Sequence, residues 1–96
     1  MPAISEIKHK REAILQVASS YGATNIRVFG SVARGEDKQN SDIDLLINLE
    51  EGRSLFDLID LKNKLEEILD RKVGVVTEES VHWYLKDKIK EEAIEI

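Results

Sequence analysis

Two short motifs in the first half of the chain contain the residues best suited to chemistry. Gly30 and Ser31 end one apolar run, and after ten intervening residues Asp42 and Asp44 open a second apolar run. Because side chains alternate faces along a strand, both carboxylates would project to the same side, with alpha carbons about 6 to 7 Å apart. Two carboxylates this close repel each other unless a cation lies between them. The pair therefore predicts a site for one or two divalent ions.

The Gly30-Ser31 pair predicts a turn that can hold a phosphate. Glycine lets the backbone turn tightly and lets a ligand approach closely, while Ser31 offers a hydroxyl and a free amide. Metal ions on paired carboxylates opposite such a turn would suit nucleotidyl transfer. The alternative is that Asp42 and Asp44 lie at a solvated strand end, with Ser41 capping the preceding loop.

The two motifs and their flanks resemble a known superfamily. The run from Gly30 to Gly35 (GSVARG) and the run from Ser41 to Ile47 (SDIDLLI) are similar to the signature of the DNA polymerase beta nucleotidyltransferases. Within that superfamily they resemble the minimal branch, the MNT domains, and the likeness extends over nearly the whole chain. The resemblance implies a polymerase-beta-like fold, with a small mixed sheet of three to four strands backed by helices.

The resemblance also implies an activity and a partner. MNT domains are paired with HEPN proteins in bacterial and archaeal toxin-antitoxin systems. The chain would then be a metal-dependent nucleotidyltransferase and antitoxin that uses ATP and one or two Mg²⁺ ions to place AMP on a hydroxyl, a tyrosine of a HEPN-type toxin. The residues implied are Asp42 and Asp44 as catalytic and metal-binding groups, and Gly30, Ser31, Arg34 and Ser41 as nucleotide-binding groups.

One position departs from the family pattern. The superfamily usually supplies a third carboxylate from a later strand, and the matching position here is Gly74. The site could work with two carboxylates and water, at a cost of about 2 to 5 kcal/mol in the barrier. Alternatively Glu78, which shares strand parity with Gly74, could reach back. A third alternative is an MNT-type antitoxin that has lost catalysis and neutralises its partner by binding.

Two further groups admit two interpretations each. Arg34 could contact a phosphate, or it could pair with Glu36 or Asp37. Trp83 and Tyr84 could stack on a base, although aromatic residues at the start of an amphipathic helix more often pack in a core or contact a partner.

The hydrophobic pattern predicts one α/β (α+β) domain over residues 1–96. A helix over 5–21, ended by Gly22, precedes a strand over 23–29 and a polar loop over 36–40. The remaining predicted elements are a strand over 42–48, a helix over 54–70 capped by Ser54, a strand over 71–77 and a helix over 80–94.

Composition limits the classes of partner. Hydrophobic residues make up 42% of the 96, charged residues 34%, and the formal net charge is −5, so direct nucleic acid binding is not expected. The chain has no cysteine, which excludes disulfides and thiolate metal sites. The sequence shows no membrane span or signal-peptide core, which predicts a cytoplasmic protein. A domain this small leaves an open cleft, which favours a protein partner, and a homo-oligomer is also compatible.

Overall fold

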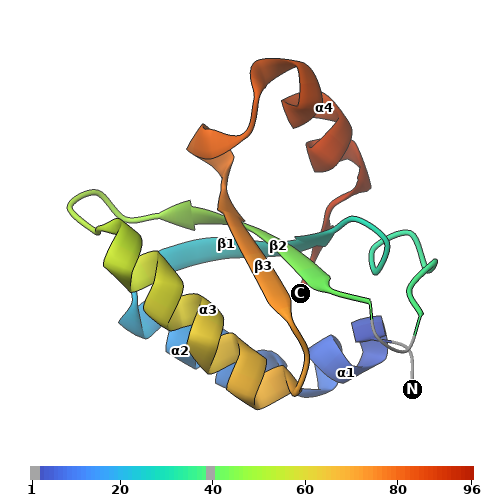
Figure 1. Cartoon of the computed structure of the whole chain (residues 1–96), viewed down its shortest axis with the longest axis horizontal. Helices are drawn as coiled ribbons and strands as arrows, with labels where there is room; N and C mark the ends of the chain where they lie inside the picture. The colour runs from blue at the N-terminus through green and yellow to red at the C-terminus, as the bar shows by residue number, and fades with distance from the viewer. Residues whose placement is uncertain (1–2, 39–40) are drawn as a thin grey trace.

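The computed structural model describes residues 3–38 and 41–96 and shows a mixed four-stranded sheet with helices (Figure 1). Strand β2 lies between β3 and β1, and β4 lies on the other side of β1. Strands β2 and β3 run parallel, whereas β1 is antiparallel to both β2 and β4. The α+β fold class predicted from the sequence is confirmed. In chain order the elements are α1 (Ala3–His9), α2 (Arg11–Ser20), β1 (Ala23–Phe29), β2 (Ile43–Leu49), α3 (Leu55–Leu69), β3 (Val73–Thr77), the 3-10 helix η1 (Glu78–Ser80), α4 (Trp83–Glu92) and β4 (Ile94–Glu95).

The hydrophobic core lies between one face of the sheet and the helices α1, α2 and α3, whereas α4 lies on the other side of the sheet (Figure 1). Every second residue of β2 and every fourth residue of the inner side of α3 enters this core. These fully buried residues are Ile43, Leu45 and Ile47 of β2 and Leu61, Leu65 and Leu69 of α3. The alternation along β2 therefore places Asp44 on the face of the sheet opposite to the three helices.

The helix predicted over 5–21 is in fact two helices that meet at Lys10. The backbone of Lys10 (φ −100°, ψ 18°) departs from helical geometry. Its ammonium group donates a 2.8 Å hydrogen bond to the carbonyl of Ile68, near the end of α3. Ile7 of α1 and Ile14 of α2 are both buried, so the apolar stripe continues across the break. An apolar stripe predicts which side of a helix is buried, but it does not predict a break in the helix. The break at Lys10 accompanies the contact of its side chain with α3.

The last predicted helix is shorter than expected, and a fourth strand follows it. Helix α4 ends at Glu92, and Ile94–Glu95 form β4, in which Ile94 is paired with Val28 and Glu95 with Arg27. The free edge of β1 offers unpaired backbone groups, and the chain end satisfies some of them. This pairing joins segments far apart in sequence, so the helical pattern over 80–94 did not indicate it.

Helix α4 contributes no buried residue to the described structure. None of its residues belongs to the hydrophobic core, and its Leu85 is 39% exposed. No helix in the described ranges is long and apolar enough to cross a membrane.

Other boundaries agree with the predictions to within one or two residues. The predicted cap of α3 is confirmed, because the amide of Ser54 donates a 3.0 Å hydrogen bond to the carboxylate of Asp57. Gly22, predicted to end a helix, follows α2 with a left-handed φ of 76°. The loop predicted over 36–40 is described as far as Lys38, and positions 39 and 40 lie outside the described residues.

Candidate active site

The Gly30 turn and Asp44 lie in direct contact. Strand β1 ends at Phe29, which is paired with Asp44 of β2, and Gly30 then turns the chain with a φ of 78°. A Cβ atom at position 30 would lie only 2.6 Å from Oδ2 of Asp44. Glycine is required here both for the left-handed backbone and for the close approach of the carboxylate. The antiparallel pairing thus unites the two motifs that the sequence separates by a polar loop.

The segment after Gly30 forms a compact hydrogen-bonded turn. The amide of Arg34 donates to the carbonyl of Gly30 at 3.1 Å, and the amide of Glu36 donates to the carbonyl of Ser31 at 2.9 Å. These bonds confirm the turn predicted at the Gly30-Ser31 pair, and no regular helix forms there. The turn keeps Gly30, half-buried Ser31 and Arg34 on one short stretch beside the start of β2.

Asp42 and Asp44 form an acidic pair in which the two members differ in environment. Asp42 precedes β2 and is exposed, whereas Asp44 is the second residue of β2 and is half-buried. Partial burial and the nearby charge of Asp42 raise the pKa of Asp44, and the Arg34 guanidinium offsets part of this rise. Within ranges 3–38 and 41–96, no three or more His, Cys, Asp or Glu residues are grouped to hold a metal ion.

Gly74 lies beside Asp44 on the neighbouring parallel strand. The register pairs Asp44 of β2 with Gly74 of β3, and a Cβ atom at position 74 would lie 3.1 Å from Oδ1 of Asp44. A side chain at this position would therefore project next to the Asp44 carboxylate. The position at which the family resemblance implies a third acid is therefore adjacent to Asp44, and in this chain it has no side chain.

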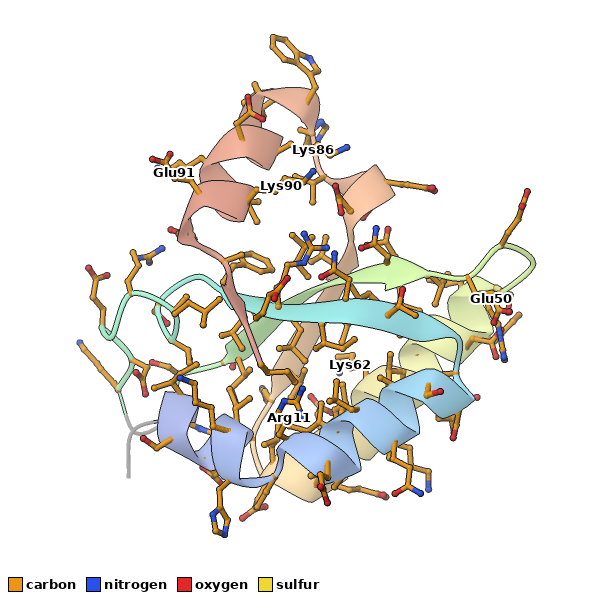
Figure 2. All side chains as sticks on the ribbon, turned by 180° about the vertical axis from the view of Figure 1, so that it is seen from behind. Arg11, Glu50, Lys62, Lys86, Lys90 and Glu91 are labelled. Atoms are coloured by element: carbon orange, nitrogen blue, oxygen red, sulfur yellow. The ribbon has the colours of Figure 1, made fainter. Side chains whose placement is uncertain are left out.

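Glu78 belongs to a separate polar cluster, which we define as Arg27, Asn48, Glu78 and Lys90. Arg27 and Asn48 each donate to Oε2 of Glu78 at 3.1 Å, and Lys90 pairs with Oε1. The hydrogen bonds from Lys90, Asn48 and Arg27 lower the pKa of Glu78 to about 2. Figure 2 shows Lys90 on α4, from which it bridges to Glu78 in η1. These contacts disfavour the alternative in which Glu78 reaches back to Asp44.

Arg34 makes ion pairs with two glutamates. Its Nε donates to Glu36 at 3.0 Å, which matches one of the two alternatives stated from the sequence. Its Nη1 donates to the carboxylate of Glu92 in α4, at 3.1 and 3.3 Å. Oε1 of Glu92 also accepts a 3.0 Å hydrogen bond from the amide of Gly30, 62 positions away in the chain. Sequence reasoning missed Glu92, since nothing in the local pattern links α4 to this turn.

The remaining candidates lie in different surroundings. The hydroxyl of Ser41 accepts a 2.7 Å hydrogen bond from the amide of Lys38, as expected for a loop cap, and its nucleotide-binding role stays a prediction.

Trp83 and Tyr84 are 85% and 63% exposed, so their interpretation as core residues is wrong. They contact each other edge to face, with ring centroids 5.9 Å apart.

One depression in the described surface lies away from the paired aspartates. It measures about 580 Å³ and lies at the far end of β2, where residues 48–53 and 77–79 line it. Figure 2 shows Glu50 in the loop at this end of the sheet. The Gly30 turn and Asp44, by contrast, lie where β1 ends and β2 begins.

Several known proteins are similar to this chain in sequence. The sequence profile of the nucleotidyltransferase domain family matches residues 10–96. The chain is 45% identical to MJ0435 of Methanocaldococcus jannaschii, provisionally named a protein adenylyltransferase, over 97% of both chains. It is also 40% identical to the protein adenylyltransferase MntA of Thermococcus cleftensis, covering 76% of this chain and 70% of MntA.

Solved structures share the fold. A structure described as a minimal nucleotidyltransferase superposes with a TM-score of 0.88 at 42% identity, covering 100% of this chain and 97% of the other. A toxin-antitoxin structure with AMP-PNP gives a TM-score of 0.75 at 23% identity, covering 88% of this chain and 69% of the other. At that identity the second match shows the fold alone.

Proposed function

Because the chain belongs to the nucleotidyltransferase domain family, we propose that it transfers AMP from ATP to a tyrosine hydroxyl of a HEPN-type toxin. In this role the chain is an Mg²⁺-dependent antitoxin. The names of its relatives from M. jannaschii and T. cleftensis, both protein adenylyltransferases, support AMP as the group transferred. The toxin partner and the tyrosine acceptor rest on the resemblance of the GSVARG and SDIDLLI motifs to MNT domains.

The observation on which the proposal depends is the contact between the Asp44 carboxylate and the Gly30 turn, with Asp42 two residues away. The pair suits a divalent ion, because a cation would offset the repulsion and burial that raise the pKa of Asp44. Mg²⁺ commonly takes one or two carboxylates and completes its coordination with phosphate oxygens and water. When bound, it would neutralise charge on the triphosphate.

The reaction balances without any further co-reactant. The acceptor oxygen attacks the α-phosphorus of ATP, the bond between that phosphorus and the oxygen bridging to the β-phosphate breaks, and pyrophosphate leaves. We assign phosphate binding to the Gly30 amide and Ser31, and metal binding to Asp42 and Asp44. Since position 74 has no carboxylate, the hydroxyl proton passes to solvent. Loss of a positioned base typically slows such a step by about 10²- to 10⁴-fold.

A second candidate is an antitoxin that acts by binding alone. It is favoured by the absence of a side chain at Gly74 and by several large apolar residues exposed on α3 and α4. Exposed apolar residues of this kind are available for contact with a protein partner. They are Leu55, Phe56 and Ile59 of α3 and Trp83, Tyr84 and Leu85 of α4.

The test is transfer of label from α-labelled ATP with Mg²⁺ to a HEPN-type toxin encoded beside this gene and co-purified with the chain. We expect label on the toxin, lost with Asp42→Asn or Asp44→Asn and increased with Gly74→Asp. The matched control Gly74→Asn has nearly the same shape but no charge, so it should not increase labelling. Label that survives both aspartate substitutions would contradict the assignment of the metal site.

The same experiment separates the two candidates. If the natural sequence gives no label and its neutralisation of the toxin is unaffected by Asp42→Asn and Asp44→Asn, the chain is an antitoxin that acts by binding. If label appears only on a toxin whose tyrosines are intact, the acceptor assignment is supported.

A further inference from the structure

The carboxylate of Glu92 occupies the donors that surround the Gly30 turn. One oxygen accepts from the Gly30 amide at 3.0 Å, and both oxygens accept from Nη1 of Arg34, at 3.3 and 3.1 Å. Figure 1 shows the end of α4 beside the turn that follows β1. The side chain of Arg34 is 44% exposed and that of Glu92 is 21% exposed, so this ion pair lies at the surface of the domain.

An amide N–H together with a guanidinium is a donor set that suits a phosphate as well as a carboxylate. Both ligands are anions that present several acceptor oxygens, and charge-assisted hydrogen bonds of this type are the stronger ones in proteins. The N–H of Gly30 has a single hydrogen atom to donate, and Glu92 accepts it in this structure. A phosphate oxygen could take the same bond only after the carboxylate moves away.

We propose that Glu92 is an internal substitute for phosphate, which holds Gly30 and Arg34 in the free protein and must be displaced for nucleotide to bind. The inference rests on the proposed function, because it assumes that the Gly30 turn binds the triphosphate. Glu92 then sets the affinity for nucleotide: the fraction of molecules in which it is displaced scales the apparent Kd.

The attachment of α4 is suited to such a displacement. The helix contributes no buried residue, and in its last turn Lys90 joins it to Glu78. The Glu92 carboxylate can leave its site at small cost, because its ion pair with the exposed Arg34 is of a kind that contributes little to stability. The competing interpretation is that Glu92 positions Arg34 for phosphate binding, and the two interpretations predict opposite effects on affinity.

The test is a calorimetric titration of the full chain with Mg²⁺ and α,β-methylene ATP, whose carbon bridge prevents AMP transfer. We expect Glu92→Gln to lower the Kd by about 3- to 10-fold, because the amide is a weaker competitor than the carboxylate. The matched control is Glu91→Gln, which removes the same charge from an exposed neighbour on α4, labelled in Figure 2. It should change the Kd by less than about 2-fold, the effect expected of net charge alone.

A second readout follows the backbone of the turn directly. In the ¹⁵N-labelled protein, Glu92→Gln alone should shift the Gly30 amide resonance, and the nucleotide analogue should shift it further in both forms. Circular dichroism of Glu92→Gln and Glu92→Ala checks that the fold is retained.

An unchanged or raised Kd for Glu92→Gln, with analogue binding to the natural sequence, would overturn this inference and leave the proposed function standing. Absence of binding to the natural sequence and to both variants would overturn the proposed function together with it.

Discussion

At the scale of single residues, Asp44 is a carboxylate whose surroundings in the fold disfavour its ionised form. Its carboxylate is half-buried, lies against the Gly30 backbone and is repelled by Asp42. A carboxyl group whose pKa is raised by folding destabilises the folded state once the pH exceeds its ordinary value of 3.8. At neutral pH the ionised pair therefore costs stability, and a bound cation would recover it.

We expect Asp44→Asn to raise the melting temperature modestly at pH 7 in the absence of metal, because it removes the desolvated charge. Mg²⁺ at millimolar concentration should raise the melting temperature of the natural sequence and have little effect on Asp44→Asn or Asp42→Asn. Thermal melts followed by circular dichroism, with and without Mg²⁺, measure both effects. An equal Mg²⁺ response in all three proteins would show that the ion binds elsewhere.

Gly74 of the neighbouring strand β3 allows a test of how a third carboxylate beside Asp44 changes stability. The 3.1 Å between a Cβ at this position and Oδ1 of Asp44 is tight, so Gly74→Asp requires a small shift of the Asp44 side chain. The substitution would also place a third carboxylate beside Asp44. We expect this variant to be less stable than the natural sequence without metal and to gain more from Mg²⁺, whereas Gly74→Asn should show a much smaller gain. Thermal melts of Gly74→Asp and Gly74→Asn at several Mg²⁺ concentrations separate the effect of the added charge from the effect of the added side-chain volume.

At the scale of elements, the polar cluster ties η1 and α4 to the sheet. Glu78 is its acceptor, with donors from β1, β2 and α4. Because these bonds lower the pKa of Glu78 from 4.5 to about 2, its ionised form stabilises the folded state. That contribution is fully present above about pH 4.5 and is lost as the pH falls towards 2.

We therefore expect Glu78→Gln to be less stable than the natural sequence at pH 7, with the difference shrinking as the pH falls from 4.5 towards 2. Urea unfolding at a series of pH values gives the two curves. The control is Glu79→Gln, an exposed neighbour in η1, which should follow the natural sequence throughout. Parallel curves for Glu78→Gln and the natural sequence would mean that the cluster does not hold the ionised carboxylate in solution.

At the scale of the whole molecule, the two sides of the sheet are unequally packed. Helices α1, α2 and α3 cover the core, whereas α4 lies on the opposite side and buries none of its residues (Figure 1). Segments with few buried apolar contacts open locally at lower free energy than the core. Helix α4 is therefore the part of the described structure best placed to move when a nucleotide or a partner binds.

Amide hydrogen exchange should report this difference. We expect amides within α4 to exchange at least about 100-fold faster than those of β2, which is paired on both sides and buried in the core. Measurements on the full chain by NMR or mass spectrometry give both rates. Equal protection of α4 and β2 would show that α4 unfolds only with the whole domain, and it would weaken the case for displacement of Glu92.

The sequence by itself determined the local features of this protein. The Gly30-Ser31 pair predicted a tight turn, and the Asp42-Asp44 spacing predicted two carboxylates on one face of a strand. Both predictions were possible because glycine conformation and strand alternation are local properties. Hydrophobic periodicity located the elements of the core for the same reason, including α3 with its Ser54 cap. The resemblance to MNT domains indicated the family, and it pointed to Gly74 as the position next to the acidic pair.

Only the tertiary structure decided which distant groups meet. The break at Lys10 accompanies a bond to Ile68, β4 forms because β1 leaves a free edge, and Glu92 reaches Gly30 across 62 positions. Local propensity and periodicity describe each segment alone, so they cannot indicate contacts that depend on how separate elements are placed. The amphipathic pattern over 80–94 predicted a helix, whereas the fold left that helix on the surface and brought its Glu92 to the Gly30 turn.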